Sequence, residues 1–145
     1  MSAAAVDAVS VTPLMRIATP GGDVLHALKA SDPGFRCFGE AYFSWVKPGA
    51  VKAWKCHQRM RLNLVVPVGL VRFAFRGQDS QDVFRTETVG ESRYVRLTVP
   101  PGIWFGFQGM GETPSLLMNL ADIEHDPDEV LRKTVSEFDY DWNVK

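Results

Sequence analysis

The chain has 145 residues, of which 46% are hydrophobic and 23% are charged, a balance that is typical of a folded globular domain and excludes a disordered chain. Sixteen basic residues against seventeen acidic ones give a net charge of -1, and without a basic cluster we expect no nucleic acid as a partner. The longest apolar stretch, residues 62–71, is interrupted by Asn63, Pro67 and Gly69 and is shorter than the ~20 residues of a membrane-spanning helix, so we expect no membrane partner either.

Residues 1–145 are expected to form one domain, with residues 1–12 as a flexible tail. After the tail, short segments rich in Val, Phe, Tyr, Leu and Trp recur between Gly, Pro, Asp and Ser, which is the pattern of an all-β sandwich or barrel. The predicted strands cover residues 23–30, 39–46, 50–57, 62–67, 70–76, 93–99, 103–108 and 115–122. Tight turns are predicted at residues 47–49, 67–69, 77–80 and 100–102.

The predicted strand at residues 50–57 carries the most informative alternation. Side chains two apart on a strand share a face, which groups Val51, Ala53, Lys55 and His57 on one side and Lys52, Trp54 and Cys56 on the other. Both faces mix polar and apolar residues, so periodicity alone leaves open which face is the interior. Two basic groups pointing into a small barrel would mark a ligand site.

A short helix is predicted near the C-terminus, over residues 126–135. Asp126 is a suitable N-cap and Pro127 a suitable first helical residue. Asp128 and Glu129 suit the positive end of the helix dipole. We expect this helix to cover one end of the barrel.

The two cysteines, Cys37 and Cys56, have no metal-ligand spacing and are too few for a disulfide framework. We expect both thiols to be free. Free thiols are typical of a reducing compartment, which favours the cytoplasm.

Four segments carry a resemblance to a known family. They are GEAYFSWVKPGAVKAWKCH at residues 39–57, NLVVPVG at 63–69, LTVPPGIWFGF at 97–107 and, beyond Asn119, HDPDE at 125–129. Over residues 21–131 the chain resembles the dTDP-4-dehydrorhamnose 3,5-epimerase family. The resemblance implies a cupin jelly-roll barrel, usually a homodimer, that removes a proton α to the C4 ketone of a nucleotide-linked sugar and returns it on the other face.

The family relies on a His base, a Lys that stabilises the enolate and a Tyr acid. The resemblance places Lys55 at the position of the catalytic His, with His57 two residues later. Asn63 falls at the position of the Lys, and the Tyr position falls near residues 117–119, where the sequence has no tyrosine. Tyr42 is the reserve candidate for the acid.

Metal-dependent cupins are similar in fold, but their first motif needs two His and a Glu and their second another His. Only His57 matches the first motif, and Phe105 stands at the His of the second. One imidazole does not hold a divalent transition metal, so we expect no metal and no other cofactor.

Lys55 and His57 are the leading candidates for proton transfer. If both point inward, burial and mutual repulsion lower their pKa values toward neutrality, and either can then accept a proton. The alternative is a solvated lysine and a hydrogen-bonded structural histidine. Asn63 or Asn119 would stabilise the enolate through an amide hydrogen bond. The alternative is that each amide only caps a neighbouring strand.

The candidates for substrate binding are basic and aromatic side chains. Basic groups suit a diphosphate and aromatic rings can stack on a base or sugar, although core packing is the commoner role of such rings in a small barrel. The candidates are Lys52, Arg59, Arg61, Arg76, Trp104 and Phe107.

These observations predict a nucleotide-sugar epimerase or isomerase in deoxysugar or cell-surface polysaccharide biosynthesis. Two alternatives stay open: a sugar-nucleotide-binding cupin without catalytic activity, and a 3,4-ketoisomerase, which removes the same proton but moves the carbonyl. The burial and the pKa of Lys55 distinguish the enzyme from the binding cupin, because a base must be buried with a lowered pKa whereas a binding residue needs only its charge.

Overall fold

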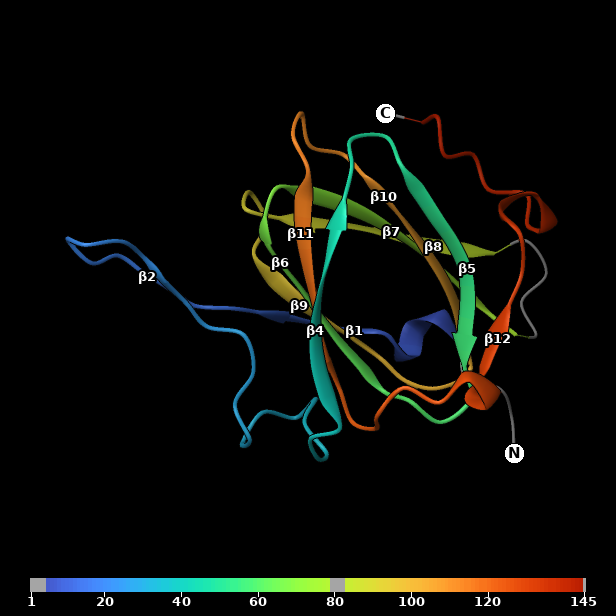
Figure 1. The fold of residues 1–145 in the computed structure, drawn as a ribbon, viewed down its shortest axis with the longest axis horizontal. Coiled ribbons are helices and arrows are strands. Elements are labelled where there is room, and N and C mark those ends of the chain that lie inside the picture. Colours follow the sequence, from blue (N-terminus) through green and yellow to red (C-terminus); the bar gives the residue numbers. More distant parts are fainter. Residues whose placement is uncertain (1–4, 79–82, 145) are drawn as a thin grey trace.

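The computed structural model describes residues 5–78 and 83–144, and in them two five-stranded antiparallel sheets pack face to face (Figure 1). The first sheet has the order β1 (Ser10–Pro13), β9 (Val95–Val99), β6 (Leu62–Val68), β11 (Ser115–Ala121) and β4 (Glu40–Val46). The second sheet has the order β12 (Val130–Arg132), β5 (Val51–His57), β10 (Ile103–Gly109), β7 (Leu70–Gly77) and β8 (Phe84–Gly90). The predicted turn at residues 77–80 lies partly outside the described residues.

Alternating apolar side chains hold the two sheets together. On β7, Val71, Phe73 and Phe75 are buried between the sheets, and on the neighbouring β10 the same is true of Ile103 and Phe105. Full burial of a side chain of this size contributes about 1.5–3 kcal/mol relative to exposure. The predicted all-β class is confirmed.

Neither β1 nor β8 was predicted from the sequence. β8 is an edge strand whose centre carries Arg85, Thr86 and Glu87, so few apolar residues remain to show an alternation. β1 lies in the stretch expected to be a tail, yet it pairs with β9 and the adjacent Val9 is buried. Residues 9–13 therefore belong to the barrel.

The predicted C-terminal helix is wrong. Residues Pro127–Glu129 form a single 3₁₀ turn, η2, which leads directly into the short strand β12. The Asp126 carboxylate caps the turn as expected, accepting a hydrogen bond from the Asp128 N–H at 3.0 Å. The chain then pairs with β5 and does not continue as a helix. Within residues 5–78 and 83–144 no helix is long and apolar enough to cross a membrane.

A two-stranded arm projects from the barrel between β1 and β4 (Figure 1). Its strands, β2 (Arg16–Ile17) and β3 (Val24–Leu25), pair with each other in a separate two-stranded sheet. The predicted strand at residues 23–30 is therefore reduced to the two residues of β3. Met15, Ile17, Val24 and Leu25 expose their apolar side chains on this arm.

Candidate active site

A β-bulge in β5 decides which side chains reach the interior of the barrel. Lys55 pairs with Phe105 of β10 whereas Lys52 pairs with Phe107, so three steps along β5 match two along β10 and Trp54 is the extra residue. Residues directly opposite each other share a face, so Lys52 and Lys55 both lie on the interior side. The prediction that Lys52 faces away from Lys55 is wrong, because strict alternation fails where a strand carries an extra residue.

The bulged strand forms one wall of a cavity of about 400 Å³, a size that suits a small organic ligand. Its apolar lining consists of Ala53, Trp54, Leu62, Leu64, Phe105, Phe107 and Leu117. Its polar lining consists of Tyr42, Ser44, Lys52, Lys55, His57, Asn119, Arg132 and Lys133. Among these described residues there are several basic side chains and no acidic one, so the cavity favours an anionic ligand.

His57 is a buried basic side chain in the lining of the cavity, and it is paired with a carboxylate. Its Nδ1 lies 2.5 Å from Oε1 of Glu129, and the two residues are only 6% and 3% exposed. The other Glu129 oxygen accepts the backbone N–H groups of Gln58 at 2.9 Å and Arg59 at 3.2 Å. A carboxylate fixed by three donors takes the Nδ1–H of His57 and leaves Nε2 with a free lone pair.

Burial lowers the pKa of His57, and Lys55 and His125 lower it further, against the opposing effect of Glu129. For Glu129, burial alone would raise the pKa, but the hydrogen bonds from His57 and the backbone N–H of Arg59 lower it below its ordinary range. His57 is therefore neutral and Glu129 ionised near neutral pH. This is the state in which the imidazole can accept a proton.

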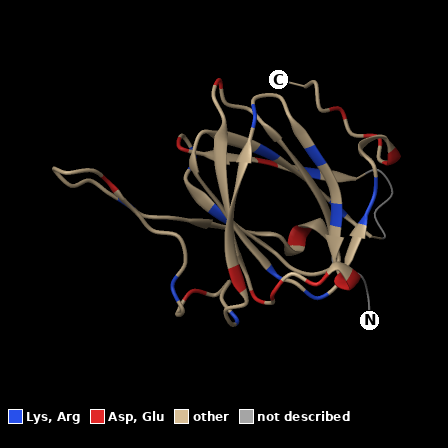
Figure 2. Cartoon of the chain, in the orientation of Figure 1, with Lys and Arg blue, Asp and Glu red and all other residues tan. Residues whose placement is uncertain are grey.

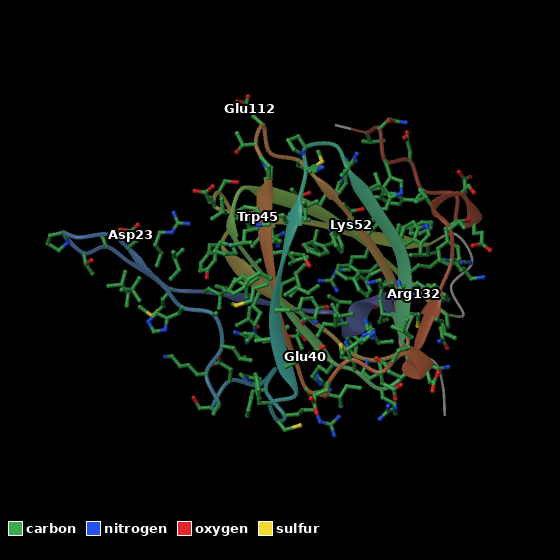
Figure 3. All side chains as sticks on the ribbon, viewed as in Figure 1. Asp23, Glu40, Trp45, Lys52, Glu112 and Arg132 are labelled. Carbon is green, nitrogen blue, oxygen red and sulfur yellow. The ribbon has the colours of Figure 1, made fainter. Side chains whose placement is uncertain are left out.

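Basic residues lie on the neighbouring strands β5 and β12 (Figure 2), and Lys52, Lys55 and Arg132 of these strands line the cavity. Figure 3 places Lys52 and Arg132 on this side of the barrel. Burial lowers the pKa of Lys55, with further lowering by the charges of Arg132 and Lys52. Lys55 is nevertheless exposed, so it lies at the rim of the cavity and not in its buried part. Lys133 contributes less charge to the cavity, because its ammonium group lies over the rings of Trp104 and Phe138 at 5.5 and 5.8 Å.

A second polar pair lies on the opposing sheet. Tyr42 of β4 and Asn119 of β11 are direct partners across the strand pair. The Asn119 Nδ2 donates to the Tyr42 hydroxyl at 3.2 Å, and Asn119 is only 1% exposed. Because the phenolic oxygen accepts this bond, the Tyr42 O–H remains to be donated into the cavity.

Asn63, the predicted partner of the enolate, does not line the cavity. Its Oδ1 accepts the Thr98 hydroxyl at 2.6 Å and the Arg96 Nε at 3.2 Å, and its Nδ2 donates to the Gly34 carbonyl at 3.0 Å. This network anchors the segment before β4 to the first sheet. The placement removes Asn63 from the candidate catalytic set, because its amide is fully used elsewhere.

Four predicted binding residues also lie outside the cavity lining. Arg59 is exposed and pairs with Asp126 at 2.7 Å. The guanidinium of Arg76 lies 4.2 Å from the ring centre of Phe138, and Trp104 packs on that same ring, both on the outer face of the second sheet. Arg61 does not line the cavity either, so only Lys52 and Phe107 of the six predicted binding residues do.

Sequence reasoning missed Glu129 and Arg132 as site residues. Both follow from the pairing of β12 with β5, which sets Arg132 opposite Lys55 and brings Glu129 to His57. The available signal was the HDPDE segment, in which Glu129 was interpreted as a helix-start residue. A strand of three residues leaves no periodic pattern that would reveal the pairing.

No family model matches the chain. The chain is 34% identical to a dTDP sugar isomerase from Desulfovibrio desulfuricans, whose crystal structure superposes with a TM-score of 0.89 over 98% of this chain and 94% of that one. It is 26% identical to the spore coat polysaccharide biosynthesis protein SpsL of Bacillus subtilis over 97% of this chain and 98% of that protein. It is 29% identical to a probable low-salt glycan biosynthesis epimerase of Haloferax volcanii over 72% of this chain and 73% of that protein.

The chain forms a jelly-roll barrel with a buried histidine–carboxylate pair and a cavity wall that carries cations. Together with these relatives, the fold and the site define a cupin of the isomerase class. The chain belongs to the family of dTDP-sugar isomerases and epimerases. The fold and family predicted from the sequence are confirmed.

Proposed function

We propose that this protein is an isomerase of nucleotide-linked 4-keto-deoxysugars in which His57 removes the proton α to the ketone. The observation that carries the proposal is the buried His57 on the wall of a cation-lined cavity, held from behind by Glu129. The family supports the reaction class, and the names of two relatives support a place in polysaccharide or glycan biosynthesis. Free thiols at Cys37 and Cys56 agree with our expectation of a cytoplasmic enzyme.

The proposed reaction uses both walls of the cavity. His57 Nε2 takes the proton from the carbon beside the ketone, and the electron pair of that C–H bond passes to the ketone oxygen as an enolate. Tyr42, on the opposing sheet, then donates its phenolic proton to the other face of the same carbon. This step inverts the centre and leaves a phenolate and an imidazolium, which exchange a proton with solvent before the next turnover.

The cations at the rim are suited to bind the diphosphate and to stabilise the negative charge that develops on the ketone oxygen. Arg132 offers a planar fork that matches phosphate oxygens, and Lys52 and Lys55 add point charges beside it. Because Lys55 is exposed, we assign it to this electrostatic role and assign the role of the base to His57. Asn119 orients Tyr42 through the hydrogen bond to its hydroxyl.

Hydrogen exchange in deuterated water tests the proposal. With a dTDP-linked 4-keto-6-deoxysugar as substrate, we expect deuterium to enter at C3 or C5 in the presence of the wild-type protein. Product analysis by NMR separates an inverted centre from a moved carbonyl and so distinguishes an epimerase from a 3,4-ketoisomerase. Binding without any exchange across several nucleotides would contradict the enzyme and favour the binding cupin.

We also propose that two copies of the chain form a homodimer. The first sheet exposes Phe43 and Trp45 on its outer face, at 63% and 60%, on the same strand whose inner face carries Tyr42. The arm is a second apolar surface, which the described residues 5–78 and 83–144 leave exposed; Figure 3 shows Asp23 on the arm, far from Lys52 and Arg132. When one chain exposes two apolar surfaces, a second copy can cover them in a symmetric dimer, and its own surfaces are covered in return.

Light scattering on a sizing column tests the homodimer. We expect a dimer for the wild type and a monomer for Trp45→Glu, which puts a charge on the apolar face. Val83→Glu is the matched control, because Val83 is also exposed but directly precedes β8, an edge strand of the second sheet. A wild-type monomer at all concentrations would contradict the proposal.

A further inference from the structure

The C-terminal segment, residues 133–144, lies over the outer face of the second sheet, whose inner face lines the cavity (Figure 1). Phe138, Tyr140 and Trp142 from this segment pack against Trp54, with ring centres 5.2, 6.0 and 5.3 Å from its own. Burial of these aromatic rings removes much apolar surface from water, which binds this short segment firmly to the sheet. The reaction proposed above uses none of these residues directly.

Trp54 joins this segment to the cavity. It is the extra residue of the β5 bulge, the feature that puts Lys52 and Lys55 on the same face. Its backbone N–H donates to the Lys133 carbonyl at 2.9 Å, and the Lys133 N–H donates back to the Trp54 carbonyl at 3.0 Å. Its indole N–H donates to the Val135 carbonyl at 3.1 Å. The bulge is thus held by three hydrogen bonds to the C-terminal segment, two along the sheet edge and one from the indole ring.

Arg72 holds the far end of the same segment. It is a buried residue of β7 whose guanidinium donates to the Trp142 carbonyl at 2.5 Å and also to the Val144 carbonyl. It donates in addition to the Gln108 side chain at 2.6 Å. Gln108 in turn donates to the Gly49 carbonyl at 3.3 Å, in the turn between β4 and β5. A charged group buried with these partners fixes residues 142–144 against the sheet.

We propose that the C-terminal segment, anchored by Arg72, is a positioning element that sets the spacing of the pocket cations by holding the Trp54 bulge. Lys52 and Lys55 flank the bulge, and Arg132 immediately precedes Lys133, the first residue hydrogen-bonded to it. Release of the segment would let these three cations move apart without touching His57. The inference rests on the proposed function, because it concerns cations that would bind the diphosphate of the substrate.

Titration calorimetry with dTDP tests the positioning role in Arg72→Met and Trp142→Ala. Arg72→Met keeps the volume of the side chain and removes its donors, and Trp142→Ala removes one ring of the cluster. We expect the Kd for dTDP to rise by about tenfold at low salt, since displaced groups bind poorly. We also expect a weaker dependence of Kd on salt, because fewer cations meet the diphosphate at once. Arg93→Met is the matched control, since Arg93 is exposed and pairs with Glu87 in another part of the barrel.

Circular dichroism establishes that each variant is folded, and a third variant, Trp54→Phe, removes the indole hydrogen bond to Val135 and part of the ring that packs against the C-terminal segment and lines the cavity. Folded variants that bind dTDP with the wild-type Kd and salt dependence would overturn the positioning role and leave the proposed function intact. A wild-type protein that does not bind dTDP would overturn both.

Discussion

His57 and Glu129 form the smallest unit of the site, and the direction of each pKa follows from what surrounds the group. His57 is buried beside Lys55 and is held neutral, while Glu129 accepts two backbone N–H groups and the imidazole and is held ionised. The carboxylate thereby fixes the tautomer of His57 and also makes it a stronger base than burial alone would allow.

Removal of the charge of Glu129 should therefore weaken the base. In Glu129→Gln we expect the pKa of His57 to fall further, because the charge that opposes its burial is lost. The acidic limb of the kcat/KM profile should move to lower pH, and kcat should fall by about 10- to 100-fold because a weaker base removes the proton more slowly. A pH profile that matches the wild type would show that Glu129 has only a structural role.

The same buried histidine makes the stability of the protein depend on pH. Its pKa is lowered from the ordinary 6.5 in the folded chain, so the unfolded chain binds more protons at this site once the pH falls below that value. We expect the free energy of unfolding to decrease below pH 6.5, before the carboxyl of Glu129, with an ordinary pKa of 4.5, begins to protonate. Urea unfolding over a pH series measures this. Part of the decrease should disappear in His57→Asn, and an unchanged slope there would assign the effect to other groups.

At the scale of elements, β5 and its bulge connect the core to the site. Sequence alternation placed Lys55 and His57 on one face correctly but could not reveal the extra residue, which is defined only by the pairing with β10. The bulge needs space on its partner strand. Gly106 supplies that space, because a Cβ there would lie 2.5 Å from the Cβ of Ala53 and 3.1 Å from the ring of Trp54.

Gly106→Ala should therefore destabilise the barrel at the bulge. We expect a loss of about 1–3 kcal/mol in the free energy of unfolding, the usual cost of extra volume in a packed site. Urea unfolding measures the change, with Gly21→Ala as control because no atom lies within 4 Å of a Cβ built there. Equal stability of the two variants would mean that the bulge tolerates displacement.

At the scale of the whole molecule, the two sheets supply different parts of the proposed chemistry. The second sheet carries His57 and the cations, and the first carries Tyr42 and Asn119. The all-β fold, and a cavity lined by Lys55, His57, Tyr42 and Asn119, could be predicted because the strands are strongly patterned and the family motifs lie on them. Glu129 and Arg132 could not, because long-range pairing of a very short strand brings them to the site. Asn63 was misplaced because its motif position does not show which partners its amide meets.

The separation of base and acid on opposing walls is tested most directly by comparing exchange with inversion in Tyr42→Phe. With a dTDP-linked 4-keto-6-deoxysugar in deuterated water, NMR measures the rate of deuterium entry and the rate of inversion at the same carbon. We expect Tyr42→Phe to keep deuterium exchange with retained configuration while inversion falls by about 10²-fold or more, and His57→Asn to lose both. Exchange that persists in His57→Asn, or exchange and inversion that fall equally in Tyr42→Phe, would contradict the assignment of the base to His57 and the acid to Tyr42.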